Sequence, residues 1–253
     1  DPQLRGRYIV SVDGRWYLNP AYDEVVDLIC AGAEEALRLY DFDGLHMDDY
    51  FYPTTDPSFD ADAYASYQAS GGALELAEFR RKALDDLVYQ LHEMTGKSRV
   101  GRIFGISPGG NVDRVFHTQY ADVYLWCGVD GYIDYICPQV YFGLEHGSYD
   151  FVKVCRTYQD MIQTDSVDLI IGMTFGKAFS GEDPWAGSGK DEWKSRKDVL
   201  VRCLKATLEL EDCQGVAGFC YQYFFDPLTG QSIAETAEER DHFVPAFQEI
   251  TWD

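Results

Sequence analysis

The stretch DFDGLHMDDYFYP, residues 41–53, reads as a strand that ends in two adjacent carboxylates. Side chains alternate between the two faces of a strand, so Leu45 and Met47 share one face. His46 and Asp48 then share the other face. In a closed sheet with helices outside, the first pair would pack against helices and the second would point inward. The stretch therefore predicts a strand whose inner face leads to a carboxylate.

Similar apolar runs recur along the chain and alternate with helix-like segments whose apolar residues are three and four positions apart. Near-continuous apolar strands that alternate with helices are typical of a buried parallel sheet. We expect strands at 7–12, 42–47, 99–107, 132–141, 168–175 and 215–224, helices at 22–39, 74–94, 150–163, 191–210 and 236–249, and long loops at 54–72 and 176–190.

A parallel α/β sheet allows a doubly wound fold or a (β/α)8 TIM barrel. The glycine-rich GISPGGN lacks the GxGxxG spacing of a dinucleotide site. Polar and aromatic residues instead follow strand after strand, as in barrel enzymes. We therefore expect a single barrel domain over residues 1–253. Because six strands are found, either the first one or two βα units lie outside this chain or the barrel is incomplete. The residues that follow strands are Asp48, Ser107, Gln139, Tyr141 and Tyr223.

Charge limits the possible partners. Lys and Arg number 21 against 43 Asp and Glu, a net charge of −22 over 253 residues. Such a charge opposes nucleic acid and anionic membrane surfaces and suits neutral or cationic ligands. No run approaches the roughly 20 apolar residues of a membrane span, and no signal-peptide pattern opens the chain. We predict no nucleic-acid partner and no membrane span.

The sequence motifs of several kinds of catalytic or metal-binding site are absent. Seven cysteines, an odd number without CxxC, indicate neither a disulfide framework nor a zinc site. There is no HExxH and no EF-hand loop, so we expect no metal and no cofactor. There is also no GxSxG serine-hydrolase elbow. What is left is carboxylate chemistry on a neutral polar ligand, the chemistry of glycoside hydrolysis.

The paired carboxylates are the candidate catalytic residues. Asp48 would lie at the barrel rim, with Asp49 as the first loop residue. Aromatic rings at Tyr50, Phe51 and Tyr52 would remove water from these carboxylates and raise a pKa toward the range of a general acid. The alternative is a pair of solvated turn aspartates.

Candidate ligand-binding residues follow the same logic. His46 would orient Asp48 or a sugar hydroxyl. Gln139 and Tyr141 share one face of their strand and would hydrogen-bond or stack on a polar ligand. Trp126 and Tyr223 are possible stacking platforms. The alternative for each ring is ordinary core packing.

Five motifs together resemble the glycosyl-hydrolase-like 10 family, a set of bacterial barrel domains: WYLNP, YDFDGLHMDDYFYP, FGISPGGN, DYICPQVYF and GVAGFCYQYF. The resemblance implies a (β/α)8 glycosidase fold that acts on a cell-envelope, peptidoglycan-type glycan, and hence an extracytoplasmic location. It carries over, as site residues, Asn19, Asp48, Asp49, Ser107, Asn111, Gln139 and Tyr141.

More distantly, DGLHMDDY is similar to the DGxDxDxE pattern of family 18 chitinases through Asp43, Gly44 and Asp48. Tyr50 stands where those enzymes carry their catalytic Glu. Asp49 is then the expected proton donor, and Asp48 would orient it or stabilise positive charge on the sugar, or the two roles are exchanged. The alternative function is a carbohydrate-binding barrel without turnover. Candidates for the second catalytic carboxylate are Asp122, Glu145 and Asp226.

Overall fold

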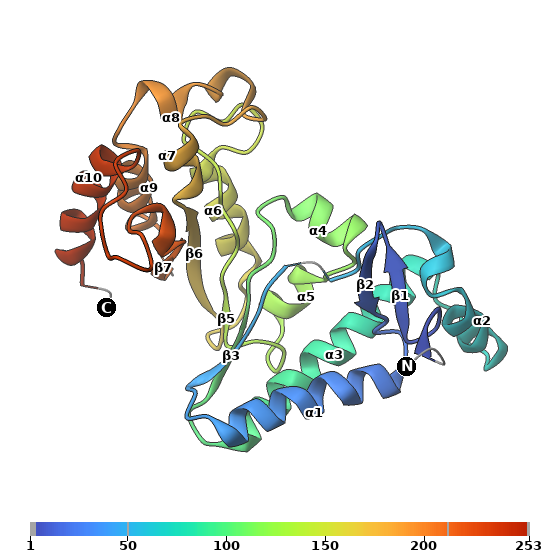
Figure 1. Ribbon diagram of the computed structural model, residues 1–253. Helices are drawn as coiled ribbons and strands as arrows, with labels where there is room; N and C mark the ends of the chain where they lie inside the picture. The colour runs from blue at the N-terminus through green and yellow to red at the C-terminus, as the bar shows by residue number, and fades with distance from the viewer. Residues whose placement is uncertain (1–3, 50, 212, 252–253) are drawn as a thin grey trace. The chain divides into compact units, whose positions relative to one another are not determined.

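The computed structural model describes residues 4–49, 51–211 and 213–251. The chain has an α/β fold with five parallel strands in the order β3-β4-β5-β6-β7 (Figure 1). A separate two-stranded antiparallel sheet pairs β1 with β2. The expected α/β class with a parallel sheet is therefore confirmed.

The chain divides into two compact units, and the boundary falls inside β5, between Tyr135 and Ile136. The first unit holds the chain up to Pro108 together with Val112–Tyr135. The second holds Gly109–Asn111 and the chain from Ile136 onward. The two units are described separately below.

The first unit contains the hairpin, two parallel strands and five α-helices among its described residues. In Figure 1, α1 lies alongside α3. Helix α1 begins with Asp23 and Glu24 at the positive end of its dipole, and α3 begins with a capping box of Glu75 and Glu78. The elements are β1 Ile9–Val12, β2 Arg15–Leu18, α1 Asp23–Leu39, β3 Gly44–Met47, the 3₁₀ helix η2 Pro57–Phe59, α2 Ala61–Ala69, α3 Leu76–Ser98, β4 Ile103–Ile106, α4 Val112–Thr118 and α5 Val123–Gly128.

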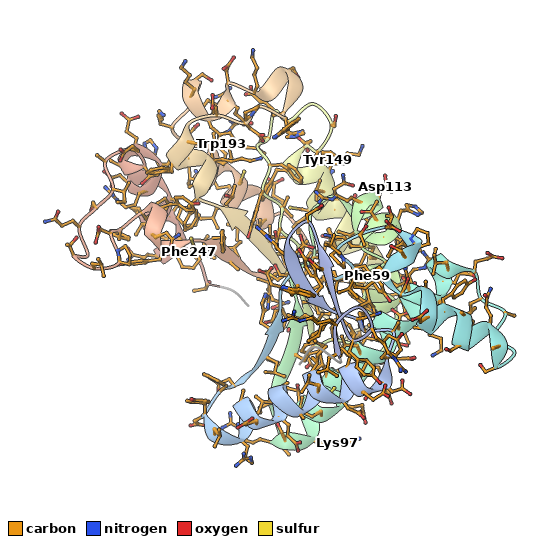
Figure 2. The ribbon with its side chains drawn as sticks, turned by 45° about the vertical axis from the view of Figure 1, so that its right-hand side comes forward. Phe59, Lys97, Asp113, Tyr149, Trp193 and Phe247 are labelled. Carbon is orange, nitrogen blue, oxygen red and sulfur yellow. The ribbon has the colours of Figure 1, made fainter. Side chains whose placement is uncertain are left out.

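The second unit contains the longer strand pair, in which β6 and β7 run parallel. Its core includes Trp193 of α8, which is labelled in Figure 2 and is 2% exposed. The elements are β5 Tyr135–Ile136 (with Tyr135 in the first unit), α6 Phe151–Met161, β6 Asp168–Thr174, α7 Gly176–Ser180, the 3₁₀ helix η3 Gly187–Gly189, α8 Glu192–Ser195, α9 Val199–Thr207, β7 Cys213–Phe219, the 3₁₀ helix η4 Tyr221–Tyr223 and α10 Ala237–Gln248.

The strand expected at 7–12 is not part of the parallel sheet, so its assignment as a barrel strand was wrong. It forms a hairpin in which Val12 pairs with Arg15. Between them Asp13 and Gly14 have φ angles of 49° and 79°. An Asp-Gly pair with positive φ at both positions makes the tight turn that joins antiparallel strands.

Three other expectations need correction. The expected loop at 54–72 contains α2, whose sequence ADAYASYQA is rich in alanine, the strongest helix former. The expected loop at 176–190 begins with α7. The helix expected over 191–210 is two helices, α8 and α9, with a break at residues 196–198.

Candidate active site

Strand β3 carries the paired carboxylates at its carboxyl end. His46 and Asp48 are exposed, as the alternation of the strand requires for two residues on one face. Strand β4 runs parallel to β3, with His46 opposite Gly105. Beyond the strand ends, the Ser107 backbone N–H donates to the Met47 carbonyl at 2.8 Å. This bond holds Ser107 beside the first residues of the loop.

The carboxylate of Asp48 is held by its own neighbour. Its Oδ1 accepts a hydrogen bond from the backbone N–H of Asp49 at 2.9 Å. A carboxylate that accepts a backbone N–H has a restricted rotamer, so the Asp48 side chain has a preferred direction. Asp49 is less exposed than Asp48.

His46 has a specific partner on the same unit. Its Nδ1 lies 2.8 Å from the hydroxyl of Tyr135, and the two rings stack with centroids 5.8 Å apart. Gly105 makes room for this contact, because a Cβ there would lie 2.1 Å from the Tyr135 ring. Partial loss of solvation lowers the pKa of His46, and the negative charge of Asp48 opposes that shift. The imidazole is therefore largely neutral at pH 7.

The rings of Phe51 and Tyr52 do not surround the Asp48 and Asp49 carboxylates, as the sequence had led us to expect. These side chains are 7% and 1% exposed. Phe51 packs against Trp126, and Tyr52 packs edge-on against Tyr120. Large rings gain the most from leaving water, so both turn into the core of the first unit. Tyr50, the third aromatic residue expected beside the carboxylates, lies outside the described residues.

A buried arginine, absent from the sequence-based site, anchors the loop that follows β3. Arg80 of α3 is 0% exposed and binds both oxygens of Asp60, with Nε–Oδ2 at 2.8 Å and Nη2–Oδ1 at 2.6 Å. Its Nη2 also donates to the Asp56 carbonyl, and its Nη1 donates to the Tyr120 hydroxyl. The guanidinium lies 5.3 Å from the Tyr52 ring centroid. One side chain thus fixes residues 52–60.

A signal for Arg80 was present in the sequence. It lies in the apolar stripe of α3, four residues before Leu84 and seven before Leu87, where a charged residue stands out. A buried charge needs a partner of opposite sign, but the sequence does not show that the partner is Asp60.

Asn19 has the contacts of a structural residue. Asn19 is 1% exposed, donates to the carbonyls of Arg7 and Phe59, and accepts from the backbone N–H of Ala21. These bonds join the hairpin to the loop after β3.

Trp126 is fully buried, and its indole N–H donates to Asp85 at 2.7 Å. Loss of solvation raises the pKa of Asp85 to about 7, against the effect of the indole bond. Asn19, Tyr52 and Trp126 therefore offer no open face to a ligand, and we do not carry them into the proposed site.

In the second unit, Asn111 and Gln139 lie at the carboxyl side of the strands. The backbone of Gln139 bridges to Gly109 on one side and to Gly172 of β6 on the other. The Asn111 side chain donates to the hydroxyl of Tyr149, labelled in Figure 2, at 2.7 Å. The GISPGGN segment is thereby tied to the loop that follows β5.

Aromatic residues follow β5 and β7 in the same unit. Tyr141 stacks on Phe219 with ring centroids 6.0 Å apart, and Phe219 is 53% exposed. Tyr223 lies against Phe179 at 5.6 Å, and Phe179 is 43% exposed. Both expected tyrosines thus belong to partly exposed aromatic pairs, which are suited to stacking on a sugar ring.

The loop after β5 is held by two buried side chains that the sequence did not reveal. Glu192 accepts the backbone N–H groups of Leu144 at 3.2 Å and Glu145 at 2.9 Å. Nδ1 of His146 accepts the backbone N–H groups of Ser148 and Tyr149. Glu192 is 2% exposed and His146 is 5% exposed. Residues 144–149 therefore have a defined conformation.

The same end of the second unit carries a cation that sequence reasoning missed. Lys177, in the first turn of α7, forms an ion pair with the buried Asp183, and its ammonium lies 5.3 Å from the centre of the Phe142 ring.

The three candidates for a second catalytic carboxylate already have structural partners. Asp122 caps α5 through the Leu125 N–H at 3.0 Å. Glu145 pairs with Arg196 at 2.9 Å. Asp226 accepts the N–H groups of residues 228 and 229, and these bonds lower its pKa, which is the wrong direction for a general acid.

Among residues 4–49, 51–211 and 213–251, no three His, Cys, Asp or Glu side chains are grouped so that they could hold a metal ion. Within the same residues, no helix has the length and apolar character needed to cross a membrane.

This fold is similar to that of a known class of enzyme. The PgaB (BpsB) glycoside hydrolase domain from Bordetella bronchiseptica superposes with a TM-score of 0.53 at 13% identity, over 85% of this chain and 64% of that one. The two chains thus share an α/β fold with a parallel sheet. Residues 4–186 match the family described as glycosyl hydrolase-like 10, and the chain belongs to that family. The resemblance to this family is confirmed, and four of the five motifs lie within the matched residues.

Two curated relatives cover most of this chain. Glycosyl hydrolase YngK of Bacillus subtilis (strain 168) is 28% identical over 229 residues, which are 84% of this chain and 43% of YngK. Glycosyl hydrolase DigH of Escherichia coli (strain K12) is 26% identical over 249 residues, which are 90% of this chain and 54% of DigH. The chain therefore spans about half the length of the curated relatives it matches.

Proposed function

We propose that this chain is the catalytic domain of a glycoside hydrolase, built on a (β/α)8-type barrel, that cleaves O-glycosidic bonds by carboxylate acid/base catalysis. The observation that carries the proposal is the pair Asp48 and Asp49 at the carboxyl end of β3 in a chain of the glycosyl hydrolase-like 10 family. Parallel α/β barrels collect their catalytic groups at that end of their strands.

In this mechanism Asp49 donates a proton to the leaving glycosidic oxygen, and Asp48 orients it or stabilises positive charge on the sugar. The hydrogen bond from the Asp49 backbone N–H fixes the direction of the Asp48 carboxylate, as its role beside the proton donor requires. The neutral imidazole of His46 is positioned by Tyr135 and supports the pair through hydrogen bonding. The two aspartates can exchange roles.

Residues at strand ends are proposed, for each unit by itself, as sugar-binding residues. In the first unit this residue is Ser107, next to the end of β3. In the second unit they are Asn111 and Gln139, with their amides, and the aromatic pairs of Tyr141 and Tyr223. Amides and hydroxyls recognise hydroxyl groups, and ring faces recognise the apolar face of a sugar.

The proposed substrate is a bacterial cell-envelope glycan of the peptidoglycan type, and the proposed location is extracytoplasmic. Family membership supports both proposals.

The test is the release of new reducing ends from peptide-free peptidoglycan strands and chitin oligomers. Asp49→Asn removes the proton donor and should lower turnover by about 10²–10⁴-fold, the usual contribution of general acid catalysis, with glycan binding retained. The matched control is Asp41→Asn, the same substitution at a 91% exposed side chain before β3, which should retain activity.

Unchanged turnover in Asp49→Asn would remove that residue from the mechanism. Glycan binding without any reducing-end release would instead support a carbohydrate-binding barrel. That alternative is favoured by Tyr50, which stands where chitinases carry their acid.

A further inference from the structure

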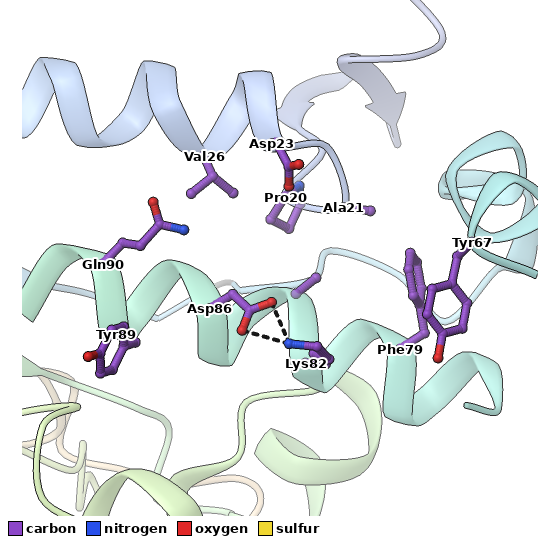
Figure 3. Close-up of a pocket in the computed structure, with 11 residues that line it drawn as sticks. Pro20, Ala21, Asp23, Val26, Tyr67, Phe79, Lys82, Asp86, Tyr89 and Gln90 are labelled. Carbon is purple, nitrogen blue, oxygen red and sulfur yellow. Dashed lines mark hydrogen bonds and ion pairs between the residues drawn. The ribbon is translucent and has the colours of Figure 1, made fainter. Parts of the chain in front are cut away.

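A groove lies between α1 and α3 of the first unit, on helix faces and not at strand ends (Figure 3). One hollow of about 470 Å³ extends from Tyr67 and Phe79 to Tyr89 and Gln90. A second hollow of about 470 Å³ shares Tyr89 and Gln90 and continues to Ser98. We call the two together the α1–α3 groove. None of its lining residues belongs to β3 or to the loop that follows it.

The groove is elongated. Its lining residues on α3 extend from Phe79 to Ser98. At a rise of 1.5 Å per residue, this distance is about 28 Å along the helix. A groove of this length suits a chain-like ligand better than a compact small molecule.

Aromatic and hydrogen-bonding groups occur together in the groove. Tyr67 and Phe79 lie side by side, with ring centroids 5.1 Å apart, and the Tyr89 side chain is 46% exposed. In Figure 3 the Gln90 amide projects from α3 toward Val26 of α1. Rings with exposed faces next to amides and carboxylates are the groups that bind a sugar. The core of a protein–protein interface is depleted of Lys, Glu and Asp, whereas both hollows are lined by such residues.

The cations of the groove are already neutralised. Lys82 pairs with Asp86 at 2.8 Å, drawn as dashed lines in Figure 3, and Lys97 pairs with Glu93 at 2.5 Å. Two further carboxylates, without a matching cation in the lining, give the groove a negative surplus that opposes anionic polymers. They are Asp23 and Glu34.

We propose that the α1–α3 groove is a second glycan-binding site, which holds a neutral polysaccharide chain by stacking on Tyr89 and by hydrogen bonds to Gln90. The choice of a glycan as the ligand depends on the proposed function. The site would retain the chain on an insoluble polymer, away from the Asp48–Asp49 pair.

Binding to insoluble chitin, a neutral polysaccharide, is measured by depletion, in the Asp49→Asn background so that turnover does not consume the polymer. The groove variant adds Tyr89→Ala and Gln90→Ala. The control adds Tyr124→Ala, because Tyr124 is 48% exposed and packs edge-on against Phe116, much as Tyr89 packs against a neighbouring tyrosine. Equal unfolding midpoints show that both variants are folded.

The groove variant should bind the polymer about tenfold more weakly, or about 1.4 kcal/mol, and the control should bind like its parent. Undiminished binding by the groove variant would overturn the proposal. So would an equal loss in the control, or a parent that does not bind chitin. Turnover of soluble oligomers by the unsubstituted chain is measured separately. A lack of turnover would reject the proposed catalysis, while the binding comparison would still decide the role of the groove.

Discussion

The loop after β3 in the first unit and the loop after β5 in the second are held in different ways. In the first unit, the Arg80 guanidinium binds the Asp60 carboxylate, both side chains being fully buried. In the second unit, the Glu192 carboxylate accepts two backbone N–H groups. Each loop thus depends on one buried charged group contributed by a helix.

The two buried charged groups differ in the partners that neutralise or hydrogen-bond them. Arg80 and Asp60 need each other, because either one alone would be a buried, unpaired charge. Glu192 accepts main-chain donors, which almost any loop sequence supplies, and its Oε1 lies 3.7 Å from Nη1 of Arg202, a longer contact than the Arg80–Asp60 pair. It also needs Gly143, where a Cβ would lie 2.1 Å from Oε2 of Glu192. The first loop is therefore fixed by side-chain identity, and the second by backbone shape.

The strongest test of this contrast is Arg80→Met. It leaves the Asp60 carboxylate buried and unpaired, so unfolding in urea should show a loss of about 3–5 kcal/mol. The double variant Arg80→Met with Asp60→Leu replaces the pair by apolar groups and should recover most of that loss. If the single variant proved no less stable than the double one, the ion pair would not be what holds this loop.

The next largest effect on stability is expected at Asp85, a carboxylate that accepts a hydrogen bond from Trp126 and forms no ion pair with the residues that the structure describes. Loss of solvation raises the pKa of Asp85 to about 7, above the ordinary 3.8 of the unfolded chain. Between pH 4 and 7 the unfolded state therefore releases its proton first, and the folded state loses stability as pH rises. Asp85→Asn should gain about 2 kcal/mol relative to the parent across that window, a value reduced because the side chain is partly exposed. Parallel stability-versus-pH curves would contradict this.

The backbone-held loop should tolerate change better. Glu192→Gln keeps one carbonyl acceptor for two N–H groups and should cost about 1–2 kcal/mol in the free energy of unfolding. Gly143→Ala should cost a similar amount, because its Cβ would displace the same carboxylate. A loss as large as that of Arg80→Met would erase the distinction between the two loops.

The smallest expected effect is that of Tyr149→Phe, which removes the hydroxyl that accepts from Asn111 at 2.7 Å. A part-buried hydrogen bond contributes about 1 kcal/mol. Thermal unfolding should show this loss, and Asn111→Ala should add little to it in the double variant, since both changes remove one bond. Fully additive losses would mean that the two side chains act independently.

The first and last long helices followed closely from the sequence. Helix α1 was expected at 22–39 and spans Asp23–Leu39, and α10 was expected at 236–249 and spans Ala237–Gln248. Their boundaries are marked by local features: apolar residues three and four apart and acidic residues in the first turn. The hairpin signal at Asp13-Gly14 was equally local but was overlooked in favour of the apolar run before it.

In the candidate site too, features set by neighbouring residues were predicted correctly, and features set by distant residues were not. Alternation along a single strand was enough to place His46 and Asp48 on one face of β3. The aromatic residues after Asp49 were misjudged, because whether a ring faces a ligand or the core depends on neighbours far along the chain. Phe51, for example, packs against Trp126.

The sequence by itself determined the alternation of strands and helices, the family, and the position of the paired carboxylates. Each of these can be read from short stretches of sequence: the periodicity of a single strand or helix, or one motif at a time. Only the tertiary structure decided the partners of Arg80, Glu192 and His46. Those contacts join residues 20, 48 and 89 positions apart. A buried polar group must find a partner wherever the fold brings one, and no local pattern records that choice.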